Sequence, residues 1–244
     1  MAGQKIVVTG GSRGLGLGIV EALVARGAVV TVVARTPGPL AELAQRLGVS
    51  TITGDVLTPG LADRVLEEVR PDVLVLNAGT VMPMAPLLEH TWESFSAAWE
   101  HDVKAGLLWM QAALRRMKRG RVLVVSSGAA IHGSPMSGGY AGAKRMLWLM
   151  ADYAQAAAAE LDHDLRFQTV IPSQMFGDTG VGDAGASAYA ARKGITKQAF
   201  LAGFGAPCSP RELGEHVTSV LVDPRNQDAR AFTIRGDTGL QPVV

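Results

Sequence analysis

A tyrosine and a lysine four positions apart form the pair best suited to proton transfer in this sequence. Tyr140 and Lys144 stand in a stretch with helical apolar spacing, so their side chains share one helix face. An ordinary tyrosine has a pKa of about 10, which is too high for an efficient base at neutral pH, and a neighbouring ammonium favours the phenolate. Ser127 ends an apolar run thirteen residues before Tyr140. Its hydroxyl can donate a hydrogen bond to a developing alkoxide. These residue types predict proton transfer at a substrate oxygen.

A glycine-rich stretch near the start, TGGSRGLG at residues 9–16, follows a short apolar run and opens a helical pattern. Glycine is costly to order, so this stretch should do something that only glycine can do. Its glycines let the backbone approach a pyrophosphate, and the helix N-terminus offers free N–H groups and partial positive charge. A tight turn between strand and helix is the alternative. The predicted contacts to a nucleotide here are Gly10, Ser12, Arg13, Gly14, Leu15 and Gly16.

The end of the second apolar run indicates which dinucleotide would bind. This run ends in VVART, with Arg35 and no carboxylate, and Arg13 adds a second guanidinium from the glycine-rich stretch. Two guanidiniums suit the 2′-phosphate of NADP(H) better than the 2′-hydroxyl of NAD(H). Each arginine is alternatively a solvated surface charge. Asp55 and Val56 are also predicted cofactor contacts. Asp55 either accepts a hydrogen bond from the adenine or caps the following turn.

Strand and helix patterns alternate along most of the chain and must position these residues. We expect one domain over residues 1–244, an α/β fold with a doubly wound parallel sheet and helices on both faces. The expected strands are 5–10, 28–34, 49–55, 72–79, 120–127, 165–171 and 231–236. The expected helices are 17–27, 39–48, 59–69, 91–118, 140–161 and 209–222. Residues 173–206, with helical potential at 186–203, break this rhythm and are predicted to form a substrate lid.

Four motifs in this order resemble the short-chain dehydrogenase/reductase family, in its compact single-domain branch. They are TGGSRGLG (9–16), NAG (77–79), Ser127 and YAGAK (140–144), and the resemblance runs from about residue 5 to about 236. It implies a Rossmann-like fold and an NAD(P)-dependent oxidoreductase. It implies that Tyr140 is the general acid and base, that Lys144 activates it and that Ser127 orients the substrate carbonyl. The further cofactor contacts that it implies are Asn77, Ala78, Gly79, Tyr140, Lys144 and Pro172.

The sequence departs from the family pattern at several positions. Asp102 stands where the family has an asparagine that supports a proton relay from the lysine. We expect Asp102 to serve that relay, with an exposed helix residue as the alternative. Pro172-Ser173 replaces the family's Pro-Gly, and Thr179 is the nearest candidate for a displaced threonine. The family's C-terminal Gly-Gly is replaced around 235–239.

A second Tyr-x-x-x-Lys pattern, Tyr189 and Lys193, lies within the irregular segment. Phe176, and not a serine, stands thirteen residues before Tyr189. We therefore place the proton donor at Tyr140 and expect Tyr189 to belong to a mobile lid or to an ordinary helix surface.

The candidate substrate contacts are mostly apolar: Ala129, His132, Met136, Met175, Phe176 and Phe200. His132 either touches the substrate or is an ordinary loop histidine. These residues favour a ketone or secondary alcohol with apolar substituents. An imine reductase, a dehydration or epimerisation on the same site, and a non-catalytic NADP-binding sensor or scaffold are the alternatives.

Composition limits the partners and the location. The net charge is +1 and there is a single cysteine, Cys208. We expect a small-molecule substrate, no nucleic acid, no membrane partner and no metal. The lone cysteine and a first strand that follows MAGQK directly favour a cytoplasmic protein without a signal peptide. The family, together with apolar faces in 91–118 and 140–161, implies a homo-oligomer, a tetramer with a dimer as the alternative.

Overall fold

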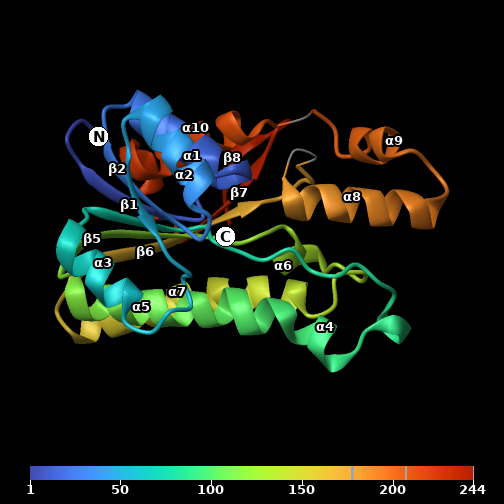
Figure 1. Cartoon of the computed structure of the whole chain (residues 1–244), viewed down its shortest axis with the longest axis horizontal. Helices are drawn as coiled ribbons and strands as arrows, with labels where there is room; N and C mark the ends of the chain where they lie inside the picture. The colour runs from blue at the N-terminus through green and yellow to red at the C-terminus, as the bar shows by residue number, and fades with distance from the viewer. Residues whose placement is uncertain (177–178, 207, 244) are drawn as a thin grey trace.

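A single twisted sheet forms the centre of the computed structural model, which describes residues 1–176, 179–206 and 208–243 (Figure 1). Its strand order is β3-β2-β1-β4-β5-β6-β7-β8. The strands up to β7 pair in parallel, and β8 pairs antiparallel with β7. Their bounds are β1 Lys5–Thr9, β2 Val29–Ala34, β3 Ser50–Thr53, β4 Val73–Leu76, β5 Arg119–Val125, β6 Asp164–Pro172, β7 Ala231–Arg235 and β8 Gly239–Pro242.

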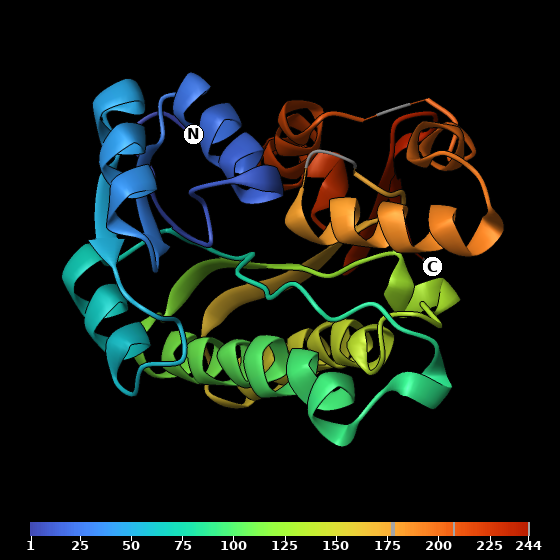
Figure 2. The same ribbon diagram turned by 45° about the vertical axis from the view of Figure 1, so that its right-hand side comes forward.

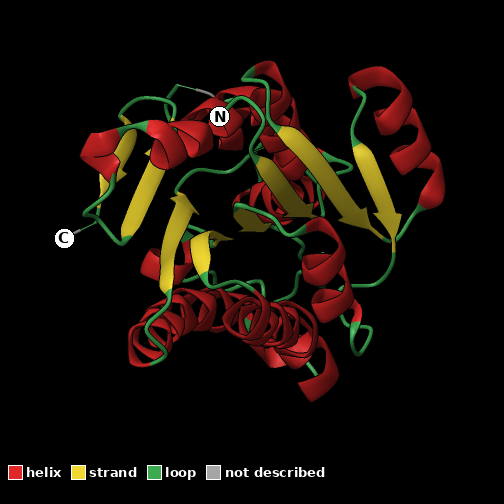
Figure 3. Cartoon of the chain, turned by 90° about the vertical axis from the view of Figure 1, so that its left-hand side faces the viewer, coloured by secondary structure: helices red, strands yellow, loops and turns green. Residues whose placement is uncertain are grey.

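Helices cover both faces of this sheet (Figure 3). The apolar side chains of α1, α2 and α10 pack on one face, and those of α3, α5 and α7 pack on the other. The helices are α1 Gly14–Ala25, α2 Pro37–Leu47, α3 Leu61–Val69, α4 Trp92–Ala98, α5 Lys104–Arg116, α6 Ala129–His132, α7 Tyr140–Glu160, α8 Gly180–Lys193, α9 Lys197–Ala202 and α10 Pro210–Val222, with short turns η1 Leu87–Glu89, η2 Trp99–Val103 and η3 Pro224–Asn226. No helix among the described residues is long and apolar enough to cross a bilayer.

The central strands are apolar on both sides because helices cover both faces of the sheet. All four residues of β4 are buried, and four of the five in β1 are buried, because helices lie on both sides of them. Glycines allow α1 and α10 to touch on one face: a side chain at Gly18 would overlap the carbonyl oxygen of Pro210, and one at Gly214 would overlap that of Gly18. This close contact fixes α1, whose first turn follows the glycine-rich stretch.

The strand order reverses beside β1, which pairs with β2 on one side and β4 on the other. The connections after these strands diverge to opposite faces and leave a crevice at their carboxyl ends, where ligands bind in folds of this kind. The glycine-rich stretch follows β1 and the NAG motif follows β4, so both predicted cofactor motifs lie at this crevice.

The elements differ from the expectations in three details. β8 was not predicted, and it makes the sheet mixed at one edge. The predicted helical stretch 91–118 is helical without a break over residues 92–116, with a π-helical turn, η2, between α4 and α5. The helical potential at 186–203 belongs to two helices, α8 and α9, separated by Gly194 in a left-handed conformation.

Candidate active site

The glycine-rich stretch forms one wall of a cavity of 340 Å³ at the carboxyl ends of β1, β2 and β4. Gly10 has a φ of +67°, and a Cβ there would lie 2.7 Å from the Cα of Ala78. Asn77 holds this close approach by donating from Nδ2 to the carbonyl oxygens of Thr9 and Gly10, at 3.2 and 3.0 Å. The backbone is therefore shaped to approach a ligand in the cavity.

The N-terminus of α1 opens into the same cavity. Arg13 occupies the N-cap position and makes no side-chain capping hydrogen bond, so within the described part of the chain the first N–H groups of α1 have no side-chain acceptor. Free N–H groups and the helix dipole favour an anion. The residues present therefore fit a dinucleotide pyrophosphate at this point.

The cavity brings together most of the residues predicted to contact a cofactor. Arg13 and Arg35 line it, and the described end of β2 has no carboxylate near Arg35. The predicted residues found on its wall are Gly10, Ser12, Arg13, Gly14, Leu15, Gly16, Arg35, Val56, Asn77, Ala78, Gly79, Asp102, Tyr140 and Lys144.

Two predicted cofactor contacts are not on this wall. Asp55 caps the turn after β3, where its Oδ1 accepts a hydrogen bond from the Leu57 N–H at 2.9 Å. The capping role considered for Asp55 is therefore present, and its contact with the adenine stays a prediction. Pro172 lies at the end of β6 and lines a second cavity instead.

A buried ion pair joins η2 to α7 at the inner end of the first cavity. Lys144 Nζ lies 3.0 Å from Asp102 Oδ2, and the two residues are 6% and 2% exposed. The alternative of an exposed Asp102 is therefore wrong. The other carboxylate oxygen, Oδ1, accepts from the Thr80 N–H at 2.9 Å. Gly79 leaves room for the pair, because a Cβ there would lie 3.2 Å from Asp102 Oδ2.

Each charge of this pair maintains the other. Burial favours the neutral form of Asp102, but the Lys144 charge and hydrogen bonds from His101, Lys144 and Thr80 outweigh it and lower the pKa of the carboxyl. Burial likewise opposes the ammonium, but the charge of Asp102 outweighs it and the pKa of Lys144 is raised. Both groups are therefore charged at neutral pH.

His101 is a site residue that the sequence reasoning did not include. Its Nδ1 lies 3.1 Å from Asp102 Oδ1, and its ring lines the first cavity. In a regular helix, the side chains of consecutive residues point about 100° apart, so a contact between them is not expected. His101 and Asp102 lie in η2, which is a π-helical turn. The only available signal was its position next to Asp102.

A second cavity, of 480 Å³, lies beside the first and contains Ser127 and Tyr140. Ser126 helps to fix this corner, because its Oγ donates to the Lys144 carbonyl oxygen at 2.8 Å. The two cavities share Leu15, Val81, Ser126, Tyr140, Thr179 and Val181. Tyr140 therefore faces both the predicted cofactor and the predicted substrate.

Most of the predicted substrate contacts line this second cavity. Ala129, His132, Met175, Phe176 and Phe200 are on its wall, together with Met82, Met84 and Phe204. Met136 is not: it is buried beneath the wall, and its N–H donates to the Tyr189 hydroxyl at 3.2 Å.

Residues of α6, α8 and α9 line the second cavity, and α8 lies beside α6 in the fold (Figure 2). We call residues 173–176 and 179–206 the α8–α9 segment; Gly177 and Asp178, which the predicted lid included, lie outside the described residues. Tyr189 joins the segment to the loop before α7 through its hydroxyl, 3.1 Å from Ser134 Oγ. Its ring stacks on Phe200 at 5.7 Å, and Lys193 Nζ lies 5.3 Å from the Phe200 ring centre.

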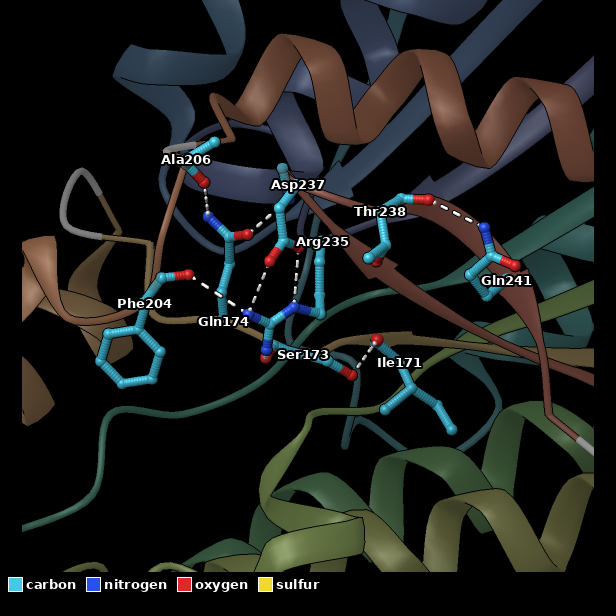
Figure 4. Close-up of polar contacts among 10 residues, drawn as sticks. Ile171, Ser173, Gln174, Phe204, Ala206, Arg235, Asp237, Thr238 and Gln241 are labelled. Carbon is cyan, nitrogen blue, oxygen red and sulfur yellow. Dashed lines mark hydrogen bonds and ion pairs between the residues drawn. The ribbon is translucent and has the colours of Figure 1, made fainter.

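Arg235, at the end of β7, fastens both ends of the α8–α9 segment (Figure 4). Its guanidinium donates to the carbonyl oxygens of Ser173, at 3.4 Å, and Phe204, at 3.3 Å, while Asp237 holds it in place. Gln174 adds a second connection, accepting from the Gly236 N–H and donating to the Ala206 carbonyl oxygen. The unpredicted β7–β8 hairpin thus supports the substrate side of the site.

Comparison with known proteins agrees with this arrangement. The family model described as short chain dehydrogenase matches residues 4–181. The chain belongs to the short-chain dehydrogenase/reductase family. It is 30% identical over 186 residues to an L-xylulose reductase of Homo sapiens, covering 74% of this chain and 75% of that protein. It is 37% identical over 139 residues to a probable oxidoreductase of Streptomyces antibioticus, covering 53% and 47%.

Solved structures of this family share the fold over nearly the whole chain. The L-sorbose reductase from Gluconobacter frateurii complexed with NADPH and L-sorbose aligns with a TM-score of 0.78 at 24% identity, covering 97% of this chain and 96% of that one. The alcohol dehydrogenase from Thermococcus sibiricus complexed with 5-hydroxy-NADP aligns with a TM-score of 0.75 at 25% identity, covering 99% of both. The protein is therefore an oxidoreductase of this family that uses a nicotinamide cofactor.

Proposed function

We propose that this short-chain dehydrogenase/reductase is an NADPH-dependent reductase of ketones, also acting on the corresponding secondary alcohols, with apolar groups beside the carbonyl. The observation that carries the cofactor preference is the pair Arg13 and Arg35 on the first cavity, without a carboxylate at the end of β2. The relatives that were solved with NADPH or an NADP analogue support it. The apolar preference rests on the methionine and phenylalanine side chains of the second cavity.

The chain's own residues supply the proton and the orientation. The bound nicotinamide would supply the hydride. Ser127 donates a hydrogen bond to the carbonyl oxygen and orients it, and the Tyr140 hydroxyl gives this oxygen its proton. Lys144 lies one helical turn from Tyr140, with Nζ 5.6 Å from the ring centre, and its positive charge stabilises the phenolate that remains. Asp102 keeps Lys144 charged.

The α8–α9 segment, residues 173–206 in the predicted lid, would close over the substrate. Tyr189, Phe200 and Phe204 form an aromatic cluster on its inner side and line the second cavity. Closure by such a segment excludes water, which strengthens the hydrogen bonds to the reacting oxygen.

A parallel assay of NADPH and NADH tests the cofactor preference. We expect a higher kcat/KM with NADPH, and we expect Arg35→Ala to reduce it roughly 10- to 150-fold, since one charge-assisted hydrogen bond contributes about 1.5–3 kcal/mol. NADH use should change little in this variant. Arg64→Ala, an exposed arginine on α3, is the matched control. Equal or better use of NADH by the unchanged protein would refute the proposal.

Two further parts of the proposal concern the state of the protein in the cell. We propose a homotetramer, because α5 and α7 present apolar side chains to solvent, including Leu107 and Tyr153. We also propose a cytoplasmic location, since a chain with one cysteine forms no internal disulfide and suits a reducing compartment.

A further inference from the structure

His101 is a titratable side chain in the first cavity that the proposed mechanism does not use. Its side chain is 15% exposed, and its Nδ1 lies 3.1 Å from Asp102 Oδ1. Its Nε2 is buried and has no hydrogen-bond partner within the described part of the chain. A histidine in this position has one nitrogen committed to a carboxylate and one free for a further partner.

Asp102 connects this histidine to the active-site lysine. One carboxylate oxygen, Oδ2, lies 3.0 Å from Lys144 Nζ, and the other, Oδ1, lies 3.1 Å from His101 Nδ1. The charged and titratable groups on the wall of this cavity are Asp102 on η2, Lys144 and Tyr140 on α7, and Arg13 and Arg35 at the ends of β1 and β2. The polar side chains thus run without a break from His101 through Asp102 to Lys144.

We propose that His101 is the proton-exchange residue of this active site, and that it resupplies Tyr140 through Asp102 and Lys144. The inference rests on the proposed reduction, because that reaction consumes a proton in every turnover. The inference goes beyond the proposed reduction by assigning a relay residue. His101 acts through Asp102 and does not touch the reacting atoms.

One proton moves along this relay in each turnover. Reduction places a hydride on the carbonyl carbon and the Tyr140 proton on the oxygen, which leaves a phenolate. The phenolate takes a proton from the Lys144 ammonium, and Asp102 then passes the His101 Nδ1 proton to the neutral amine. As His101 gives up its Nδ1 proton, its Nε2 takes a proton from water, so the ring stays neutral. Proton exchange with water then restores the Nδ1–H form. Oxidation of the alcohol uses the same steps in reverse.

The carboxylate can carry this proton because its environment changes during the transfer. While Lys144 is an ammonium, its charge lowers the pKa of Asp102 and keeps it ionised. Once Lys144 has given up its proton, that charge is gone, and the buried carboxylate accepts a proton more readily. A histidine is suited to the outer position, because one ring nitrogen can accept a proton while the other releases one.

Comparison of single and repeated turnovers tests this role. We would use NADPH with 2,3-butanedione as the probe ketone, and the variants His101→Ala and His101→Gln. The first hydride transfer uses the proton already on Tyr140, so its rate in a single turnover should stay within about twofold. Steady-state kcat should fall roughly 10- to 100-fold, because each new cycle waits for a proton.

Added imidazole separates proton supply from a structural effect. We expect imidazole to restore kcat in His101→Ala in proportion to its concentration, and His216→Ala on α10 to show neither the loss nor the rescue. Equal losses in the single turnover and in kcat, or no loss in kcat, would overturn the proposal, as would a loss that imidazole does not restore.

A measurement without turnover separates this proposal from the proposed function. In nitrogen-15 spectra of the cofactor-free protein, the Nδ1 signal of His101 should shift in Asp102→Asn, because its acceptor weakens, and that of His216 should not. An unchanged His101 signal would overturn the relay. Failure of the unchanged protein to oxidise NADPH with any of a panel of ketones would instead refute the proposed function.

Discussion

Asp102 gives this active site a negative charge where an asparagine would be neutral. A carboxylate accepts hydrogen bonds as an amide oxygen does, but when ionised it donates none. The charge stabilises the Lys144 ammonium, 3.0 Å away, and raises the pKa of that lysine. The same charge opposes formation of the Tyr140 phenolate. Reduction, which starts from protonated Tyr140, should therefore remain effective at neutral pH, and alcohol oxidation should need higher pH.

The Asp102→Asn variant tests this electrostatic effect. Without the carboxylate, we expect the rise of alcohol oxidation with pH to move to lower pH, as measured from kcat/KM profiles. The change also leaves Lys144 buried without its partner, which should cost about 3–5 kcal/mol of unfolding free energy at pH 7. Folding lowers the pKa of Asp102, so its stabilising charge is present above about pH 4. As pH falls further, Asp102 gains a proton, and the difference in unfolding free energy between the two proteins should shrink. Superimposable pH profiles would contradict the electrostatic role.

The two tyrosines of the second cavity should differ sharply in their effects. Tyr140→Phe should abolish turnover and leave NADPH binding measurable, because the cavity wall keeps its ring. Tyr189→Phe removes the hydroxyl contacts to Ser134 and Met136, and it should alter the KM for the ketone or the substrate range instead. Steady-state kinetics with fluorescence titration of NADPH distinguishes these results. The opposite pattern would move the proton donor to α8.

Among individual residues, the sequence predicted best those that a single motif places at the active site. Tyr140, Lys144 and the glycine-rich stretch lie at the predicted cavity, because strand ends and a helical spacing of four placed them there. His101 was not found, since it reaches Asp102 only through a π-helical turn that no sequence pattern indicated. Met136 was misplaced because a loop can turn a methionine inward or outward without any change in its periodicity.

The α8–α9 segment depends on a strand that is distant in sequence. Arg235 on β7 bonds to backbone oxygens at both ends of the segment, so the sheet edge and the substrate cavity wall are mechanically joined. These bonds tie residues 173 and 204 to one side chain. The position of the segment is therefore set by the β7–β8 hairpin as well as by its own helices.

Removal of this connection should loosen the wall of the substrate cavity. We expect Arg235→Ala to raise the KM for a ketone about tenfold, which corresponds to the loss of one hydrogen bond to a charged group, with a smaller change in kcat. Hydrogen exchange of α8 and α9 should become faster. Arg225→Ala is a suitable control, because Arg225 also pairs with an aspartate two residues away but lies at η3. A similar effect of both variants would indicate a general loss of stability.

The predicted elements agree with the structure wherever burial on both faces produced a clear pattern. β1, β2, β4, β5 and β6 are of this kind, and each predicted strand overlaps the observed one. β8 has no such pattern, since it is an edge strand with two of its four residues exposed. It exists because β7 offers it unpaired backbone groups, which is a property of the folded sheet and not of the local sequence.

Exposed apolar side chains occur on α5 and α7, two neighbouring helices on the surface of the molecule. Leu107 on α5 is 46% exposed and Tyr153 on α7 is 60% exposed, and these helices lie side by side over one face of the sheet (Figure 1). A symmetric contact of the two helices with a second copy would bury both side chains.

Light scattering at micromolar concentration should therefore give about four times the chain mass of 25.5 kDa. Leu107→Glu should reduce the assembly to smaller species, because it places a charge in the expected interface. Leu88→Glu, at an even more exposed leucine on η1, should leave the mass unchanged. A monomeric mass for the unchanged protein would refute self-association.

The first turn of α8 forms a wall common to both cavities, through Thr179 and Val181. A ligand in the second cavity would therefore contact the same turn as a dinucleotide in the first cavity, and we expect it to hinder departure of the dinucleotide. Such an arrangement favours a compulsory order of binding, in which the nucleotide enters first and departs last. Excess ketone would then trap the spent nucleotide in a dead-end complex, so the velocity should pass through a maximum as the ketone concentration increases.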